Sequence, residues 1–154
     1  MKIMDFLNEE AISVDLQATD KTGVVRELVR LLKKTGGVKN EEEMAKTIME
    51  RESLGSTGIG QGVAIPHGKS NSVKEMTAAF GLSRKGVDFE SLDGEPVYIF
   101  FMLVAPEDSA GPHLKALARI SRLLKDKFFR DTLRGAKDVK ELAKIIRQED
   151  ERKY

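Results

Sequence analysis

The pattern of apolar and polar residues near the N-terminus predicts a strand followed by a helix. Residues 11–17 (AISVDLQ) alternate between apolar and polar side chains, as a half-buried strand does. Asp20 stands where it can cap the helix that follows, and Gly36 and Gly37 end that helix. The apolar stripe of the helix comprises Val25, Leu28, Val29 and Leu32.

A second helix is indicated by Asn40, which together with Glu43 resembles a capping box. This helix runs through Met44 and Ile48 to about Arg51. The next apolar segments have the lengths and composition of strands, and they cover residues 63–65, 76–82 and 96–104. The last of these segments is apolar on both faces, which predicts a central position in a sheet.

Two further helices are predicted in the C-terminal third. The first begins at Gly111-Pro112-His113, with the proline at the first helical position. Its predicted stripe comprises Leu114, Leu117, Ala118, Ser121 and Leu124. The last helix begins near Asp138 and is expected to bury Val139, Leu142, Ala143 and Ile146.

Strands and helices therefore interleave along the chain, which is typical of the α/β class. The chain has 154 residues and no repeat or linker, so residues 1–154 are expected to form a single domain. We predict a mixed β-sheet of about five strands flanked by helices.

Composition excludes several classes of function. The 26 Lys and Arg residues nearly balance the 25 Asp and Glu residues, so no global field attracts nucleic acid or an anionic membrane. There is no cysteine, which excludes disulfides, thiolate catalysis and zinc sites built on cysteine. No apolar run has the length of a membrane span or the form of a signal peptide. We therefore expect a cytoplasmic protein.

The segment 58–68 (GIGQGVAIPHG) stands out because glycines surround one short apolar strand that leads to a proline and a histidine. Glycine allows a positive φ and the close approach of an anion, while proline fixes its own φ and restricts the preceding residue. Such a segment holds one side chain in one place. That side chain is His67, whose imidazole can act as a nucleophile near neutral pH.

Other candidate residues would complete a site for a phosphoryl group. His113 lies in the first turn of a predicted helix, where the helix dipole favours an anion. Arg51 offers a planar guanidinium that matches phosphate oxygens. Phosphoryl transfer mainly needs positioning and charge stabilisation, which these groups can provide. The predicted phosphate-binding residues of the adjoining loop are Ser56, Thr57, Gly58 and Gly60.

Simpler interpretations of the same residues remain open at this stage. His67 could be a structural or solvated loop histidine, and His113 a surface residue. Arg51 stands beside glutamates and could be a solvated charge. The glycine segment is neither a dinucleotide-binding fingerprint nor a Walker A loop, and the two histidines lack carboxylates at metal-ligand spacing, so we predict no metal and no cofactor.

The segment 51–68 (RESLGSTGIGQGVAIPHG) resembles the signature of the fructose/mannitol-type enzyme IIA domains of the bacterial phosphoenolpyruvate-dependent phosphotransferase system. The resemblance includes Glu52 at an acidic or amide position, the pair Ile59-Gly60 and the VAIPHG ending. Chain length, the order of elements and the second histidine also agree, so the resemblance spans nearly the whole chain.

This resemblance implies a phosphocarrier. The histidine that matches His67 takes a phosphoryl group on Nε2 from the phosphohistidine of HPr and passes it to the IIB domain of a sugar permease. The histidine that matches His113 helps to hold the phosphoryl group, and the arginine that matches Arg51 belongs to the same pocket. Contact with the membrane would then occur only through the permease.

Three functions stay open on sequence alone. The first is sugar transport with a fructose- or mannitol-class permease. The second is a nitrogen-branch IIA protein whose histidine phosphorylation controls partner binding without sugar transport, which the GSTGIG form of the loop and the length both fit. The third is a small-molecule module that uses the glycine loop to bind an anion. Apolar residues near the pocket could form a docking surface or pack in the core: Leu54, Ile59 and Leu114.

Overall fold

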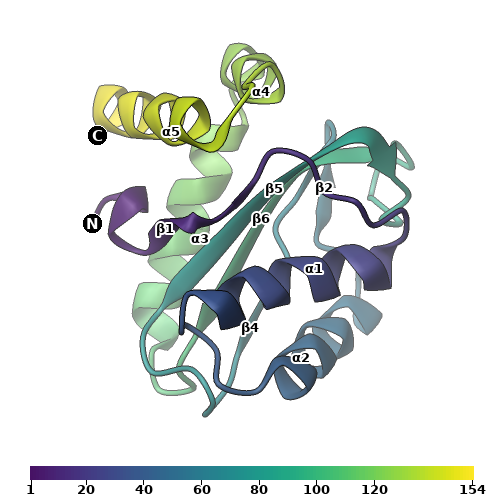
Figure 1. Ribbon diagram of the computed structural model, residues 1–154, viewed down its shortest axis with the longest axis vertical. Coiled ribbons are helices and arrows are strands. Elements are labelled where there is room, and N and C mark those ends of the chain that lie inside the picture. Colours follow the sequence, from purple (N-terminus) through teal and green to yellow (C-terminus); the bar gives the residue numbers. More distant parts are fainter.

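The computed structural model describes residues 1–154 and shows the predicted α/β architecture (Figure 1). Its N-terminal half contains a 3-10 helix η1 (Ile3–Asp5), β1 (Leu7–Ser13), α1 (Lys21–Lys34), α2 (Glu41–Ser53), β2 (Gly58–Gly60), β3 (Val63–Ala64) and β4 (His67–Lys69). Two long strands and three helices follow: β5 (Thr77–Val87), β6 (Val97–Ala105), α3 (Ala110–Leu124), α4 (Lys127–Arg134) and α5 (Val139–Lys153).

The sheet is mixed, as predicted, and is centred on β6. The strand order is β1-β5-β6-β3-β2, and β4 also pairs with β6. β1 runs parallel to β5, and β3 and β4 run parallel to β6, whereas the β5–β6 and β2–β3 pairs are antiparallel. Eight of the nine residues of β6 are buried, in agreement with the predicted central position of residues 96–104.

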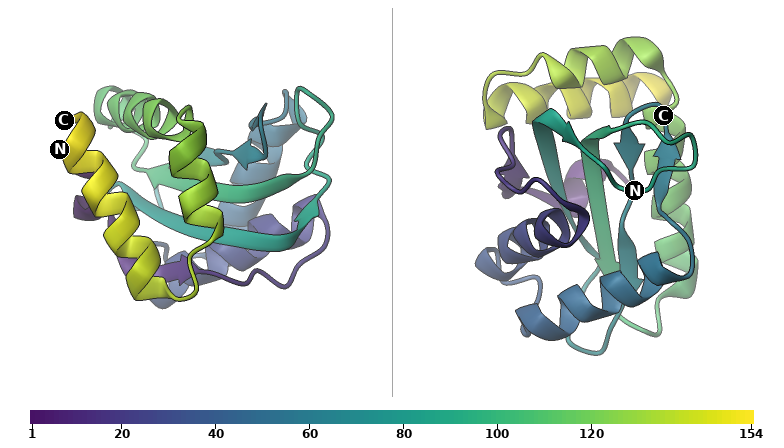
Figure 2. Two further views of the ribbon diagram at one scale, coloured as in Figure 1. Left: turned by 90° about the horizontal axis from the view of Figure 1, so that it is seen from above. Right: turned by 90° about the vertical axis from the view of Figure 1, so that its right-hand side faces the viewer.

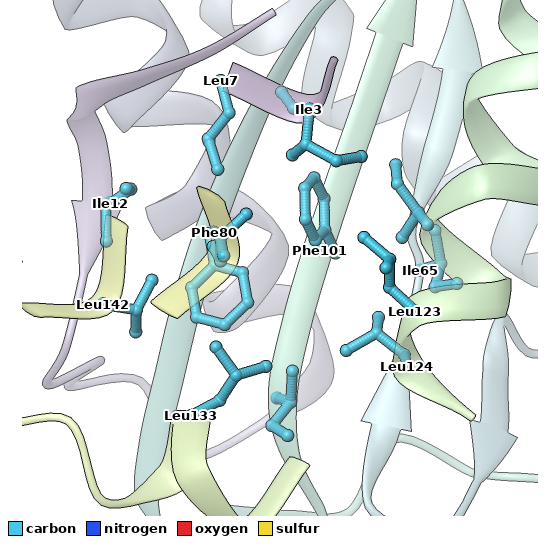
Figure 3. Packing of buried hydrophobic residues seen from close by; sticks show 14 of the residues in the cluster. Ile3, Leu7, Ile12, Ile65, Phe80, Phe101, Leu123, Leu124, Leu133 and Leu142 are labelled. Atoms are coloured by element: carbon cyan, nitrogen blue, oxygen red, sulfur yellow. The ribbon is translucent and has the colours of Figure 1, made fainter. Parts of the chain in front are cut away.

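Helices cover both faces of the sheet, with α1 and α3 on opposite sides of the strands (Figure 2). Under α3, α4 and α5, the rings of Phe80 and Phe101 meet edge to face at 5.6 Å between centroids (Figure 3). The other face buries apolar residues of α1 and α2, among them the predicted α1 stripe. The two chain ends lie side by side, joined by a hydrogen bond from the Ile3 amide to the Asp150 carboxylate.

The structure corrects three predictions of local structure. The first strand covers Leu7–Ser13 and not residues 11–17. α3 begins after Ser109, which puts Pro112 at the third helical position. The residues that this helix buries are His113, Ala116, Ile120, Leu123 and Leu124. Leu114 and Ala118 of the predicted stripe are therefore exposed. The short elements α4, β2 and β4 were not predicted.

No helix of the structure has the length and apolar character needed to cross a membrane.

Candidate functional site

His67 is the first residue of β4, so strand pairing and not a free loop sets its backbone. It lies opposite Leu103 of β6, and the Leu103 amide donates a hydrogen bond to the Pro66 carbonyl. The next residue, Gly68, lies directly under α2: a Cβ at this position would be 3.2 Å from Ile48 and 3.3 Å from Thr47. Glycine thus lets α2 pack close to the histidine-bearing strand, and a Cβ here would require these side chains to shift slightly.

The imidazole of His67 is oriented by the chain itself. Its Nδ1 lies 2.8 Å from the carbonyl oxygen of Ile65. A carbonyl oxygen can only accept a hydrogen bond, so Nδ1 carries the proton in the neutral ring and Nε2 keeps its lone pair. The side chain is half-buried and makes no other hydrogen bond within the chain. Nε2 is thus the nucleophilic atom of this residue.

His113 is a buried residue, which excludes its interpretation as a surface histidine. It is the fourth residue of α3, only 6% exposed, and its Nδ1 has no hydrogen-bond partner in the chain. Burial, followed by the nearby charges of His67 and Lys69, lowers the pKa of His113 to about 4. The ring is therefore neutral at pH 7 and adds no positive charge beside His67.

The structure brings the two histidines together. Their ring centroids are 5.7 Å apart and the ring planes are tilted by 55°. Lys69, which we did not predict, contributes a positive charge that acts on His113. The sequence held a signal for this lysine, because residues two apart on a strand share a face and His67 and Lys69 both belong to β4.

Arg51 lies in the last turn of α2, as predicted. Arg51 Nη1 donates a hydrogen bond of 2.8 Å to the Gly55 carbonyl, and Arg51 makes no other side-chain hydrogen bond within the chain. No hydrogen bond links Arg51 to either histidine. The guanidinium is thus fixed at one corner by the loop and keeps the rest of its five N–H donors free for an external group.

The predicted phosphate-binding groups of the loop already have partners inside the chain. The Ser56 hydroxyl donates to the Phe89 carbonyl and accepts from the Gly58 amide. The Thr57 hydroxyl donates to the carboxylate of Glu52. Gly60 has a φ of +97°, so it provides a turn that other residues rarely adopt. A phosphate-binding role for these residues stays a prediction. The hydrogen bonds fix the conformation of the loop, which we call the frame of the site.

A buried ion pair anchors this frame to the rest of the fold. The Glu52 side chain accepts hydrogen bonds from the amide and the hydroxyl of Thr57 and lies 3.0 Å from the Lys21 ammonium. The Glu52 side chain is 1% exposed, and Lys21 packs over the ring of Phe89. The first residue of α1, the end of α2 and the loop before β2 are thereby tied together. This arrangement, like the carbonyl of Ile65, was not predicted.

Apolar side chains are exposed on the segments that surround the site. Leu54 follows α2, Ile59 lies on β2 and Leu114 follows His113 on α3, and their exposed fractions are 85%, 46% and 69%. These values exclude the core-packing alternative for all three residues. Leu114 lies on the helix that carries His113, and an exposed apolar side chain there suits a protein-docking surface.

Comparison with known proteins shows which sequences and folds this chain resembles. A fructose-specific EIIABC component of the phosphotransferase system from Bacillus subtilis is 41% identical over 97% of this chain, which spans 24% of that relative's length. The crystal structure of the nitrogen regulatory protein IIA-Ntr from Neisseria meningitidis has a TM-score of 0.86 and 34% identity, over 92% of this chain and 97% of that one.

A solved complex of enzyme IIAMTL and phosphorylated enzyme IIBMTL from Escherichia coli shares the fold, with a TM-score of 0.78 and 22% identity over 90% of this chain and 95% of that one. Residues 5–149 match the family described as "Phosphoenolpyruvate-dependent sugar phosphotransferase system, EIIA 2". With a histidine pair at one end of the same α/β fold and a family match over nearly its whole length, the chain belongs to the EIIA 2 family of phosphotransfer components.

Proposed function

We propose that this protein is a phosphocarrier that accepts a phosphoryl group from phospho-HPr on His67 and passes it to the IIB domain of a fructose- or mannitol-class permease. The observation that carries the proposal is the hydrogen bond between His67 Nδ1 and the Ile65 carbonyl. It leaves Nε2 unprotonated in the neutral ring, which is the state that a phosphoryl acceptor requires. Both phosphoryl transfers would take place in the cytoplasm.

The transfer exchanges one P–N bond for another. The Nε2 lone pair of His67 attacks the phosphorus of the donor phosphohistidine, and the donor nitrogen leaves with the electron pair of the broken P–N bond. The proton on Nδ1 stays in place, held by Ile65. In the second transfer, a nitrogen or sulfur nucleophile of the acceptor attacks the phosphorus. His67 Nε2 then leaves with the electron pair of its P–N bond.

Neighbouring groups would stabilise the charge of the transferred group. Phosphoryl transfer passes through a loose transition state whose charge is spread over three oxygens. The neutral ring of His113 can donate one N–H to an oxygen, the free donors of Arg51 can bind others, and Lys69 adds a positive charge. We therefore assign His113 and Arg51 to the phosphoryl pocket together with His67.

Docking would use the exposed apolar side chains beside the site. A carrier must release each partner quickly, so the contact area should be modest. Leu114 is adjacent to His113 in the sequence and is exposed, which makes it the best candidate for a residue that both partners touch. In this proposal His67 is the nucleophile that both partners reach, and the docked partner excludes water from it.

The test is phosphorylation of the full chain with enzyme I, HPr and radiolabelled phosphoenolpyruvate. The wild-type chain should gain one acid-labile, base-stable phosphate, and His67→Gln should gain none while keeping its circular dichroism spectrum. His113→Ala is the matched control, because it removes the other histidine and should still accept label. An unlabelled wild-type chain, or a labelled His67→Gln chain, contradicts the proposal.

A second candidate function is nitrogen-branch regulation, in which phosphorylation of His67 controls binding to a target protein and feeds no sugar. Its support is the similarity to the IIA-Ntr protein of Neisseria meningitidis along nearly all of both chains. Both functions share the first transfer. They separate at the second step, because a transport component passes its phosphate to a IIB domain and a regulatory protein does not. The neighbouring genes distinguish the two functions independently. Genes for a IIB/IIC permease favour sugar transport, and nitrogen-regulation genes favour regulation.

A further inference from the structure

Four basic residues gather at the end of the sheet that is remote from His67. Arg84 and Lys85 lie near the end of β5, and Arg134 and Lys137 flank the turn between α4 and α5. The Arg84 guanidinium donates to the carbonyls of Arg134 and Ala136, 2.8 Å each, which joins the two segments. None of the four takes part in an ion pair in this structure.

This cluster lies far from the proposed phosphoryl site. Tyr98, at the start of β6, lies beneath Arg134, whereas His67 pairs with Leu103 of the same strand. Five residues of a strand span about 17 Å. A ligand bound to the cluster would therefore not touch His67.

Tyr98 provides a fixed platform for one of the arginines. A Cβ on Gly86 would lie 2.8 Å from the Tyr98 ring, so the ring packs directly on the Gly86 backbone. Gly86 has a φ of +85°, a conformation that glycine adopts without strain. The guanidinium carbon of Arg134 lies 3.8 Å from the centroid of this ring. The side chain of Arg134 is thus held in place without forming a hydrogen bond.

Both guanidinium groups keep donors for a ligand. Arg84 uses two of its five N–H donors on carbonyls, and Arg134 uses none of its own. The two side chains line one cavity of about 80 Å³, together with Leu82, Ser83 and Tyr98. Two like charges beside one small cavity repel each other, and an anion between them would remove that repulsion.

We infer that this cavity is a second anion site, which binds the phosphate group of a small metabolite. Pre-positioned arginines match the oxygens of a tetrahedral anion with paired hydrogen bonds. The cavity admits one such group and little more. Lys85 follows Arg84 and Lys137 follows Ala136 in the sequence, and both lysines are exposed, so they add positive charge to these two segments. The site goes beyond the phosphocarrier function and does not depend on it.

The test uses inorganic phosphate as the probe, added to the full chain in place of chloride at constant ionic strength. Tyr98 and Tyr154 are the only tyrosines and there is no tryptophan, so a Tyr154→Phe chain reports on Tyr98 alone by fluorescence. Amide chemical shifts of Lys85 and Gly86 give a second readout. Both should change with saturation, and equally in a His67→Gln background.

Variants decide whether the arginines bind the probe. Arg134→Gln removes the guanidinium and its charge but keeps a polar side chain, and it should weaken phosphate binding about tenfold in the chemical-shift titration. Arg147→Gln is the matched control, because Arg147 is exposed on α5 and unpaired, and it should bind as the wild type does. Absence of saturation in the wild type, or equal affinity in Arg134→Gln, overturns the inference and leaves the phosphorylation of His67 untouched.

Discussion

The ammonium of Lys21 lies 3.0 Å from the buried carboxylate of Glu52, and this ion pair joins α1 to the loop that carries Thr57. Glu52→Ala would leave the Thr57 hydroxyl without its partner and the Lys21 ammonium with only exposed Glu90, 3.6 Å away. Loss of one member of a buried pair costs about 3 kcal/mol of unfolding free energy, and urea denaturation measures it. Glu42→Ala breaks the exposed pair with Arg26 and should cost less than about 1 kcal/mol. Equal losses in the two variants would contradict the structural role of Glu52.

The buried ring of His113 predicts a pH dependence of stability. Its pKa is about 4 in the folded chain and 6.5 when exposed, so the unfolded chain binds the extra proton between these values. The stabilisation that the neutral ring contributes is present above pH 6.5 and is lost as the pH falls toward 4. The difference amounts to about 3 kcal/mol.

Unfolding free energies of the wild type and His113→Asn should be compared across this pH range. Carboxylates titrate in both proteins, so the difference between the two curves isolates His113. We expect the difference to fall with decreasing pH in this window. A difference independent of pH would show that His113 is as readily protonated in the fold as in water.

Removal of the second imidazole should affect the phosphorylated state more than its formation. His113→Ala should still accept phosphate from HPr, because His67 keeps its hydrogen bond to Ile65. The phosphate loses a neighbouring donor, so onward transfer should slow or the phosphoprotein should have a shorter half-life. The loss of radiolabel from the phosphoprotein gives the hydrolysis rate when no acceptor is present and the rate of onward transfer when an acceptor is added. Rates equal to those of the wild type would remove His113 from the pocket.

The docking surface can be tested with two exposed apolar residues at different places. Leu114→Asp puts a charge beside His113 and should raise the HPr concentration needed for half-maximal phosphorylation about tenfold. Phe128→Asp makes the same kind of change on α4, where the side chain is 80% exposed, and should leave this concentration unchanged. Neither change should affect the melting temperature. An effect of Phe128→Asp alone would move the docking surface to α4.

Local signals in the sequence sufficed to predict the three longer helices that begin with a capping side chain. Asp20, Asn40 and Asp138 each accept a hydrogen bond from the amide three residues later, as predicted for helix starts. Asp126 caps α4 in the same way, but eight residues contain too little periodicity to predict that helix.

Tertiary contacts decided the elements that were misplaced. Residues 14–17 keep the alternation of a strand, yet β1 ends at Ser13, and beyond it the Leu16 amide makes a single hydrogen bond to the Leu82 carbonyl of β5. In α3 the cap is Ser109, three residues before Pro112, and this shift turns His113 inward. The glycine-rich segment was enough to single out His67, and the predicted helix start singled out His113. The carbonyl that orients His67 could not be predicted, because backbone groups that accept from a side chain leave no mark in the sequence.

In the proposed phosphocarrier, the acceptor nitrogen of His67 would stay in one place, because His67 belongs to a paired strand and its ring is hydrogen-bonded to the Ile65 carbonyl. The donor and the recipient proteins must then bind the same site one after the other, and each blocks the other while it is bound. Flux through such a carrier is governed by competition, so an excess of unphosphorylated HPr would slow delivery to the recipient even when every molecule of the carrier is charged.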